Sequence, residues 1–216
     1  MRDALKRGMD CAGALGALLV LSPVMLIVAA LVLADLGRPV LFRQVRTGRW
    51  GVPFTMTKFR TMREAHDPSG APLPDELRVT AVGRLLRRFR LDETPELLMV
   101  LTGRMSLVGP RPLPPEILGT IPRSAERLGV RPGLTGLAQV SGNTLLTNHE
   151  KVAIDIHYSR TWSLGLDLRI LLKTVVMLAI GSRRDEVLIR EALAAFAAPA
   201  PVTAGAVPAG PGAQPR

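Results

Sequence analysis

Two adjacent carboxylates, Asp92 and Glu93, stand inside a strongly basic stretch of the sequence. Three of the five residues before them are arginines, and Arg111 follows further on between two prolines. A carboxylate among arginines is held ionised, and the same guanidinium groups can neutralise an incoming diphosphate. This pattern predicts a site that acts on an anionic, phosphate-bearing substrate.

The acid pair could itself carry the chemistry. A carboxylate can attack a phosphoryl group to form an acyl phosphate, which splits one difficult transfer into two simpler steps. The alternative is that Asp92 and Glu93 complement the N-terminal dipole of a following helix, a common use of acidic residues. We expect such a helix, with Thr94 as its N-cap and Pro95 as its first residue.

Several basic side chains are candidates for contacts to the anion. Arg111 precedes Pro112 and follows another proline, so a stiff backbone holds it as a bidentate phosphate clamp. Lys58, Arg60 and Arg87 are further candidates by their positions. We expect at least one of these side chains to face solvent or lipid instead.

Length and composition bound the class of protein. The chain has 216 residues, a net charge of +10 and one cysteine, which excludes a disulfide framework. The positive charge suits nucleic acid, anionic lipid or phosphorylated substrates. Aromatic residues make up only 4% of the chain, too few for the stacking platforms of a nucleic-acid binder. We therefore expect no nucleic-acid partner.

An uncharged apolar run extends from Cys11 to Ala34. As one helix it would reach roughly 36 Å, enough for a hydrocarbon core about 30 Å thick. Pro23 lies in its middle, where it removes the amide that would bond the carbonyl of Leu19. We expect the helix to kink or break there, with the Ser22 hydroxyl available to the freed carbonyl.

The flanks of this segment predict its topology. Both are basic, and positive charge prefers the cytoplasmic side of a membrane. A re-entrant helix, broken at Ser22 and Pro23, would keep both flanks on that side. A kinked single-pass anchor is the alternative, whereas a cleaved signal peptide is disfavoured because the apolar region is too long.

The whole chain reads as α+β, in three parts. Residues 1–36 form the membrane helix, 37–196 a compact, mainly helical catalytic domain with a small β-hairpin and interfacial helices, and 197–216 a disordered Ala/Pro/Gly-rich tail. The hairpin is expected from strands at 39–46 and 53–58. We expect helices at 77–89, 116–128, 149–160 and 166–181, and a strand running through Val140.

Four motifs in this order carry a resemblance to a known family. They are Lys58-Phe59-Arg60-Thr61-Met62, Leu91-Asp92-Glu93-Thr94-Pro95, Met105-Ser106-Leu107-Val108-Gly109-Pro110-Arg111-Pro112 and Val130-Arg131-Pro132-Gly133-Leu134-Thr135-Gly136. Together with Ser22-Pro23, they make the chain resemble the bacterial sugar transferases, the small monotopic phosphoglycosyl transferases. The resemblance runs from about Lys6 to about Lys173.

The resemblance implies an activity. It implies transfer of a sugar 1-phosphate from a UDP-sugar to undecaprenyl phosphate, with release of UMP, through a covalent phosphosugar enzyme that requires Mg²⁺. The product would begin a lipid-linked glycan, such as exopolysaccharide, capsule, O-antigen or a glycoprotein glycan. The implied location is the cytoplasmic face of a bacterial inner membrane, where downstream glycosyltransferases are possible partners. A non-catalytic basic membrane-surface module is the alternative function.

The resemblance also implies residue roles. Asp92 matches the nucleophile, and Glu93 matches its partner, which helps to hold Mg²⁺ or manages the acceptor proton. Both Asp92 and Glu93 are expected as Mg²⁺ ligands, since this ion needs few carboxylates beside phosphate oxygens. Arg111 and Pro112 belong to the nucleotide-diphosphate end of the site, and Arg131 is a further candidate contact there.

Three departures from the family pattern affect substrate choice. Arg104 replaces an acidic residue, Glu96 stands where glutamine is common, and the stretch 141–144 lacks a Gly-Arg-Asn that many members carry. Three further residues fall on family positions that we expect to be structural: Asp155, Tyr158 and Asp167.

Overall fold

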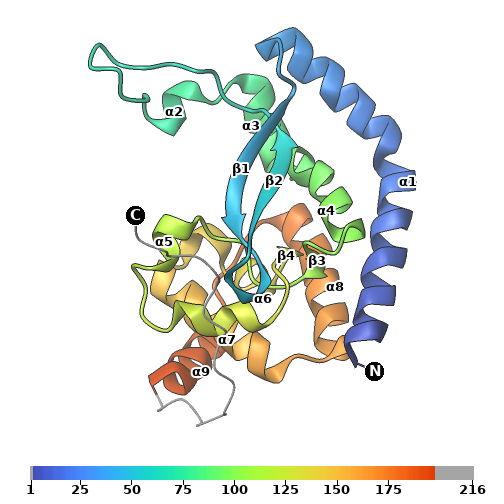
Figure 1. Cartoon of the computed structure of the whole chain (residues 1–216), viewed down its shortest axis with the longest axis vertical. Coiled ribbons are helices and arrows are strands. Elements are labelled where there is room, and N and C mark those ends of the chain that lie inside the picture. Colours follow the sequence, from blue (N-terminus) through green and yellow to red (C-terminus); the bar gives the residue numbers. More distant parts are fainter. Residues whose placement is uncertain (1, 198–216) are drawn as a thin grey trace, which may run out of the picture.

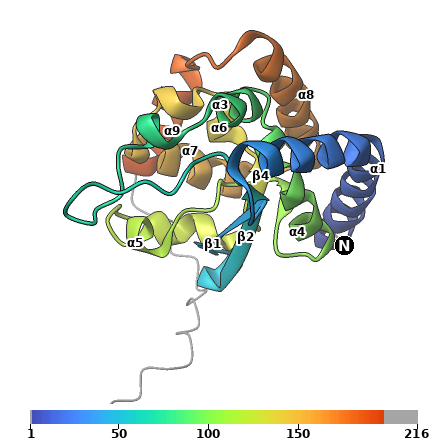
Figure 2. The same cartoon turned by 90° about the horizontal axis from the view of Figure 1, so that it is seen from above.

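The structure, a computed structural model, describes residues 2–197. Its first element is one long helix, α1 (Arg2–Leu36), which runs through Pro23 without interruption and changes direction along its length (Figures 1 and 2). The Ser22 hydroxyl donates to the carbonyl oxygen of Leu19 over 3.1 Å. This is the carbonyl that Pro23 leaves without an amide partner, so the predicted local compensation is confirmed. The helix bends but stays continuous.

The predicted hairpin follows. Strands β1 (Leu41–Thr47) and β2 (Pro53–Phe59) pair antiparallel, with Leu41 opposite Phe59 and Thr47 opposite Pro53. A 3₁₀ turn, Arg49–Gly51, joins them, and Gly51 takes a φ of +79°. Only glycine adopts this region without strain, so the turn depends on it.

The acid pair lies on a tight turn between two helices. The predicted helix at 77–89 is divided into α2 (Asp75–Arg78) and α3 (Ala81–Arg88), because the Thr80 hydroxyl accepts from the Gly83 amide and starts α3 afresh. A 3₁₀ turn, Leu91–Glu96, then leads into α4 (Leu97–Leu101).

The prediction that Thr94 caps a helix is wrong. Its hydroxyl donates to the carbonyl of Leu91 instead of accepting from a helical amide. Pro95 lies inside the 3₁₀ turn, not at its start.

A short parallel pair, β3 (Ser106–Val108) and β4 (Gly133–Thr135), joins the middle of the chain. A Cβ at Gly133 would lie 2.1 Å from the Gly109 amide nitrogen, so the two backbones approach too closely for side chains. The strand expected through Val140 is wrong, because residues 137–140 form α6 (Leu137–Val140).

The helix expected at 116–128 is also wrong. The chain forms α5 (Pro115–Leu118) and a separate 3₁₀ turn, Ser124–Gly129. Arg123 between them has a φ of +59°, which no continuous right-handed helix accommodates.

Three helices complete the domain. The predicted α7 (Asn148–Thr161) and α8 (Leu164–Ile180) are present, and α9 (Glu186–Ala197), for which no helix was predicted, packs against α7. The core gathers Ile154 and Tyr158 of α7, Ile170 of α8 and Ile189 of α9. The α+β class is confirmed as mixed helices and small sheets. Of the tail expected at 197–216, Ala197 ends α9, and residues 198–216 lie outside the described part.

Both ends of α1 are tied to this one domain. Near its start, Lys6 Nζ donates to Asp167 Oδ2 over 2.6 Å, at the beginning of α8. At its end, the Arg60 guanidinium donates to the carbonyl oxygens of Leu36 and Gly37. The two ends of the apolar helix therefore lie against the same body.

Apolar packing repeats this pattern. Ala14 is buried against α4, and Val28 and Val32 are buried against β2 and α3. The three most exposed large apolar side chains of α1 lie near its centre: Leu19, Val20 and Leu26. Among the described residues, α1 is the one helix whose length and composition would allow it to cross a membrane.

Candidate active site

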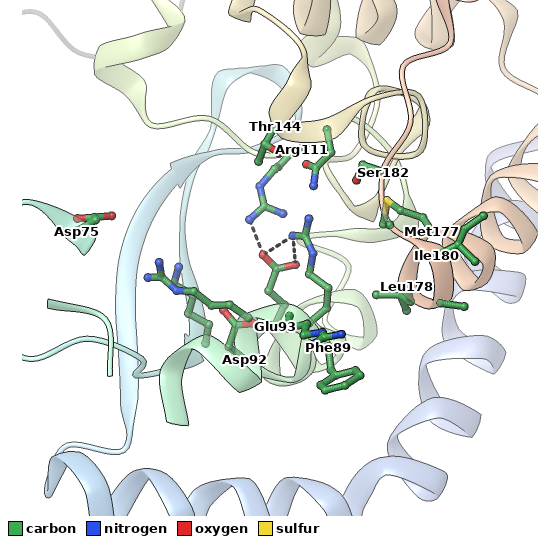
Figure 3. Close-up of a pocket in the computed structure, with 17 residues that line it drawn as sticks. Asp75, Phe89, Asp92, Glu93, Arg111, Thr144, Met177, Leu178, Ile180 and Ser182 are labelled. Carbon is green, nitrogen blue, oxygen red and sulfur yellow. Dashed lines mark hydrogen bonds and ion pairs between the residues drawn. The ribbon is translucent and has the colours of Figure 1, made fainter. Parts of the chain in front are cut away.

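The acid pair opens onto a cavity of about 780 Å³ between α3, the end of α8 and the loop after α6 (Figure 3). Its basic lining comes from Lys58, Arg87, Arg88, Arg90 and Arg111, and its acidic lining from Asp75, Asp92 and Glu93. The sequence thus places two adjacent carboxylates in a hollow surrounded by positive charge, as the motif predicted.

The turn that carries the carboxylates begins with a left-handed residue. Arg90 has a φ of +56°, and this reversal ends α3 and starts the 3₁₀ turn. Side chains three residues apart eclipse in a 3₁₀ helix, so Glu93 and Glu96 point the same way and Asp92 points elsewhere. All three carboxylates are buried.

Glu93 is fixed by two arginines. Its Oε1 lies 2.5 Å from Nη2 of Arg111, and its Oε2 lies 3.2 Å from Nη1 of Arg90 (Figure 3). Burial would raise the pKa of Glu93, but Arg111, Arg90 and Lys58 outweigh it and hold this pKa below its usual value. Glu93 is therefore an ionised anchor for the guanidinium groups of the cavity.

Asp92 is the uncommitted carboxylate. Its Oδ1 is buried and has no hydrogen-bond partner among the described residues. Burial and the neighbouring Glu93 raise the pKa of Asp92, against the opposing effect of Lys58 and Arg87. A desolvated carboxylate with an unshared oxygen can act as a nucleophile toward a phosphoryl group.

Lys58 and Arg87 come from the elements that flank the turn. Lys58 lies on β2, and burial lowers its pKa more than Asp92 and Glu93 raise it. Arg87, on α3, is oriented by a hydrogen bond of 3.0 Å from its Nε to the Thr61 hydroxyl. The structure thus brings three of the candidate anion-binding residues, Lys58, Arg87 and Arg111, together in the cavity of Asp92.

Three other predicted site residues lie elsewhere. Arg60 caps the end of α1, Arg131 donates from Nε to the carbonyl of Gly103 over 3.1 Å, and Pro112 faces a separate small cleft beside the hairpin turn. None of them lines the cavity. Arg60 follows Lys58 by two positions in the sequence, but its strand has ended, so the two side chains diverge.

A buried ion pair supports Arg111 from behind. Arg127 Nη2 lies 2.5 Å from Asp155 Oδ2, and the same guanidinium donates to the Arg111 carbonyl over 2.6 Å. Both partners are almost fully buried. Asp155 therefore has the structural role expected of it, one step removed from the cavity.

The sequence did not single out several lining residues for the site. Arg90 was noted only as part of the basic stretch. Its left-handed backbone conformation could not be predicted, because arginine rarely adopts that conformation. The loop residues Asn143 and Thr144 complete one wall, and the end of α8 supplies another. The departure noted at 141–144 was the available signal for that loop.

The carboxylates also suit a divalent cation. Within residues 2–197 no three His, Cys, Asp or Glu side chains gather to hold a metal by themselves. Mg²⁺ needs few protein carboxylates when phosphate oxygens and waters supply its other ligands. The unpartnered oxygen of Asp92 fits this requirement, whereas both oxygens of Glu93 already contact arginines.

Comparison with known proteins gives a consistent result. Residues 1–181 match the family model for bacterial sugar transferase. An uncharacterized sugar transferase of Bacillus subtilis, EpsL, is 45% identical over 79% of this chain and 85% of its own length. A UDP-glucose:undecaprenyl-phosphate glucose-1-phosphate transferase of Caulobacter vibrioides is 43% identical, over 80% and 69%. The exopolysaccharide production protein ExoY of Sinorhizobium fredii is 41% identical, over 82% and 87%.

Proposed function

This chain belongs to the bacterial sugar transferase family, and on that premise we propose that it transfers a sugar 1-phosphate from a UDP-sugar to undecaprenyl phosphate. The substrate classes follow the name of the Caulobacter relative. The product would be a membrane-bound sugar diphosphate that begins a lipid-linked glycan, and exopolysaccharide is the first candidate because of the Sinorhizobium relative.

One observation carries the proposal. Asp92 is a buried carboxylate with an unshared oxygen, in a cavity whose basic side chains suit a diphosphate. In the first step, an Asp92 oxygen attacks the phosphorus that bears the sugar. The bond from that phosphorus to the bridging oxygen breaks, and UMP leaves with this oxygen.

The second step regenerates the enzyme. An oxygen of undecaprenyl phosphate attacks the same phosphorus, the bond to Asp92 breaks, and the carboxylate is restored. Arg111 and Arg90, held by Glu93, stabilise the charge that develops on the phosphoryl oxygens in both steps. Glu93 has its pKa lowered, which favours this anchoring role over that of a proton acceptor.

Magnesium has a place in this scheme. Asp92 would hold Mg²⁺ together with substrate phosphate oxygens, and Glu93 would join only by releasing an arginine. When bound, the ion would neutralise charge on the diphosphate and on the departing UMP.

The way α1 is attached supports a re-entrant membrane helix. Lys6 at the start of α1 bonds to Asp167, and Arg60 of the same domain bonds to the carbonyls at the end of α1, while Leu19, Val20 and Leu26 in the middle of the helix are exposed and apolar. A straight span would carry one end of α1 away from this domain. We therefore propose that the bend enters the bilayer and that the domain lies on the cytoplasmic face of a bacterial membrane.

UMP release tests the proposed function. Purified protein in lipid nanodiscs, supplied with Mg²⁺ and undecaprenyl phosphate, should release UMP from one member of a UDP-sugar panel that begins with UDP-glucose. EDTA should stop the release, and the Asp92→Asn protein is the matched control. If no UDP-sugar gives UMP above this control, the chain is a non-catalytic membrane-surface module.

A further inference from the structure

The walls of the cavity differ in polarity. On one side of the carboxylates lie Arg111 and Thr144, together with Asn143 from the same loop. On another lie apolar side chains at the end of α8, among them Leu178 and Ile180 (Figure 3). The hollow therefore offers a polar wall and an apolar wall to whatever enters it.

The apolar wall is continuous with an exposed stripe along α8. Leu168, Leu172, Val175 and Val176 recur at helical spacing and are each more than half exposed. Leu178 and Ile180 extend the stripe by one turn to the rim of the cavity. An apolar path thus runs along the outer side of α8 and ends beside the catalytic carboxylates.

Helix α8 lies beside the membrane helix. The Lys6–Asp167 pair joins α1 and α8 near the starts of both helices, where Figures 1 and 2 show them close together. Arg169 and Lys173 stand on the exposed side of α8 among its apolar residues. Basic side chains next to apolar ones suit the boundary between lipid headgroups and hydrocarbon. The path therefore lies on the side of the molecule that α1 would hold against a bilayer.

Phe89 adds a second apolar edge. It ends α3, lines the cavity and is half exposed, and in Figure 3 it points toward the side on which the ribbon of α1 passes. Together Phe89, Leu178 and Ile180 leave an apolar opening on the α1 side. The polar wall around Thr144 lies away from it.

We propose that Leu178, Ile180 and Phe89 form the groove for the first isoprene units of the lipid acceptor. This inference rests on the proposed function, because the occupant is the hydrocarbon chain of the phosphate that attacks the phosphosugar. A polyprenyl phosphate needs cations for its head and apolar contact for its chain, and it must pass from membrane to site. The opening between α3 and α8 supplies apolar contacts at the rim and the basic side chains deeper in the cavity.

A nucleotide sugar has no such chain, so the two walls separate the two substrates. The phosphates of both meet at Asp92, but the uridine and sugar are polar and suit the side of Arg111, Asn143 and Thr144. Binding of one substrate through its own wall leaves the other wall free. This arrangement suits a two-step transfer in which UMP departs before the lipid attacks.

The test uses a double variant, Leu178→Gln with Ile180→Gln, and a matched control, Leu168→Gln with Leu172→Gln. Both pairs remove two exposed leucine-sized side chains from the same helix, and neither contains a core residue. Binding of undecaprenyl phosphate and of the five-carbon dimethylallyl phosphate is measured in nanodiscs by isothermal titration. Flotation with liposomes measures membrane association separately.

We expect the Leu178/Ile180 variant to bind undecaprenyl phosphate about tenfold more weakly, the effect of losing one or two buried apolar contacts. Its affinity for dimethylallyl phosphate and its liposome flotation should match wild type, as should every value for the control pair. Equal losses of affinity for undecaprenyl phosphate in both variants would mean that α8 only contacts the membrane. No loss in the Leu178/Ile180 variant would mean that the isoprene chain binds elsewhere. Either result overturns the proposed groove.

The two proposals can fail separately. The single burst of UMP from a UDP-sugar in the absence of any lipid acceptor reports the first step alone, and it should be unchanged in the Leu178/Ile180 variant. A wild-type protein that binds undecaprenyl phosphate through this groove yet releases no UMP would reject the transfer and keep the groove.

Discussion

Arg111 Nη2 lies 2.5 Å from Glu93 Oε1, and this contact distinguishes two carboxylates that are neighbours in the sequence. The pKa of Glu93 is lowered by its arginine partners, whereas burial raises that of Asp92. Neighbouring acids whose pKa values are pushed apart usually divide the chemistry between them. Here Glu93 is paired with two arginines, while Asp92 keeps a buried oxygen without a hydrogen-bond partner among the described residues.

Replacing Arg111 with lysine should separate charge from geometry. Lysine keeps the positive charge but cannot hold Glu93 and a phosphate oxygen in one planar fork. We expect kcat for UMP release to fall by about 10²-fold, as when one transition-state donor is lost. Arg84→Lys, on the exposed side of α3, is the control and should retain wild-type turnover. Equal turnover in both variants would remove Arg111 from the mechanism.

Glu96 gives a pH-dependent effect on stability. Burial, with Glu93 adding to it, raises the pKa of Glu96 from 4.5 to about 8. Between these two pKa values, Glu96 keeps its proton in the folded state but loses it in the unfolded chain. The contribution of protonated Glu96 to the free energy of unfolding is therefore complete below pH 4.5 and disappears as pH rises through about 8. The side chain of Glu96→Gln does not titrate, so the variant does not lose stability in this way. The stability of Glu96→Gln relative to wild type should therefore increase as pH rises from 4.5 to about 8.

The size of this advantage has an upper bound of about 1.4 kcal/mol per pH unit between the two pKa values. Melting temperatures of wild type and Glu96→Gln, measured from pH 5 to pH 9, provide the comparison. A difference that stays constant over the whole range would show that Glu96 ionises normally.

The membrane topology of α1 is tested with single cysteines. Cys11 is the only native cysteine, so Cys11→Ser gives a clean background. Ala4→Cys and Arg43→Cys then report the two flanks of α1. Both should resist a membrane-impermeant maleimide in intact cells and react after permeabilisation. Labelling of one flank alone in intact cells would establish a simple span. Adding Pro23→Ala should shift the protein toward that pattern, because it restores a helical hydrogen bond.

The segment after α8 braces the polar wall of the site. Arg184 Nη1 donates to the Leu145 carbonyl over 2.6 Å, and its Nη2 lies 2.7 Å from Glu150 Oε1. This holds the loop that carries Asn143 and Thr144. Arg184→Ala should therefore raise KM for the UDP-sugar several-fold with kcat nearly unchanged.

The neighbouring, exposed Arg183 is the matched control for Arg184, because Arg183→Ala removes the same charge. The KM of Arg183→Ala for the UDP-sugar should equal that of wild type. A fall in kcat without a change in KM for Arg184→Ala would place its effect on the chemistry and contradict the bracing role.

The predictions that rested on neighbouring residues in the sequence were the ones confirmed by the structure. Short runs of β-branched and aromatic residues with glycines between them predicted the hairpin. The Ser22 hydroxyl was the predicted partner of the carbonyl that Pro23 leaves free, and it makes that hydrogen bond. The acid pair among arginines marked the cavity: Asp92, Glu93 and the arginines just before them line it, together with Lys58 from β2.

The features that depend on contacts between distant parts of the chain were not predicted. The three-residue strands β3 and β4 exist only because Gly109 and Gly133 let two remote backbones approach, so no periodicity reveals them. Arg60 and Arg131 were assigned by position in their motifs, but backbone carbonyls of α1 and of Gly103 bind them instead. The turn at Arg90 reverses the chain with a residue that gives no turn signal.

Intact-protein mass spectrometry can detect the covalent phosphosugar on Asp92. Wild-type protein incubated with its UDP-sugar and Mg²⁺, but without a lipid acceptor, should gain the mass of one sugar phosphate. It should release no more than about one equivalent of UMP, and peptide mapping should find the adduct on Asp92. Asp92→Asn should form neither, since an amide is a poor nucleophile. An adduct on another residue would assign the nucleophile to that residue. Near wild-type turnover by Asp92→Asn without any adduct would indicate direct attack by the lipid phosphate, and either result rules out Asp92 as the nucleophile.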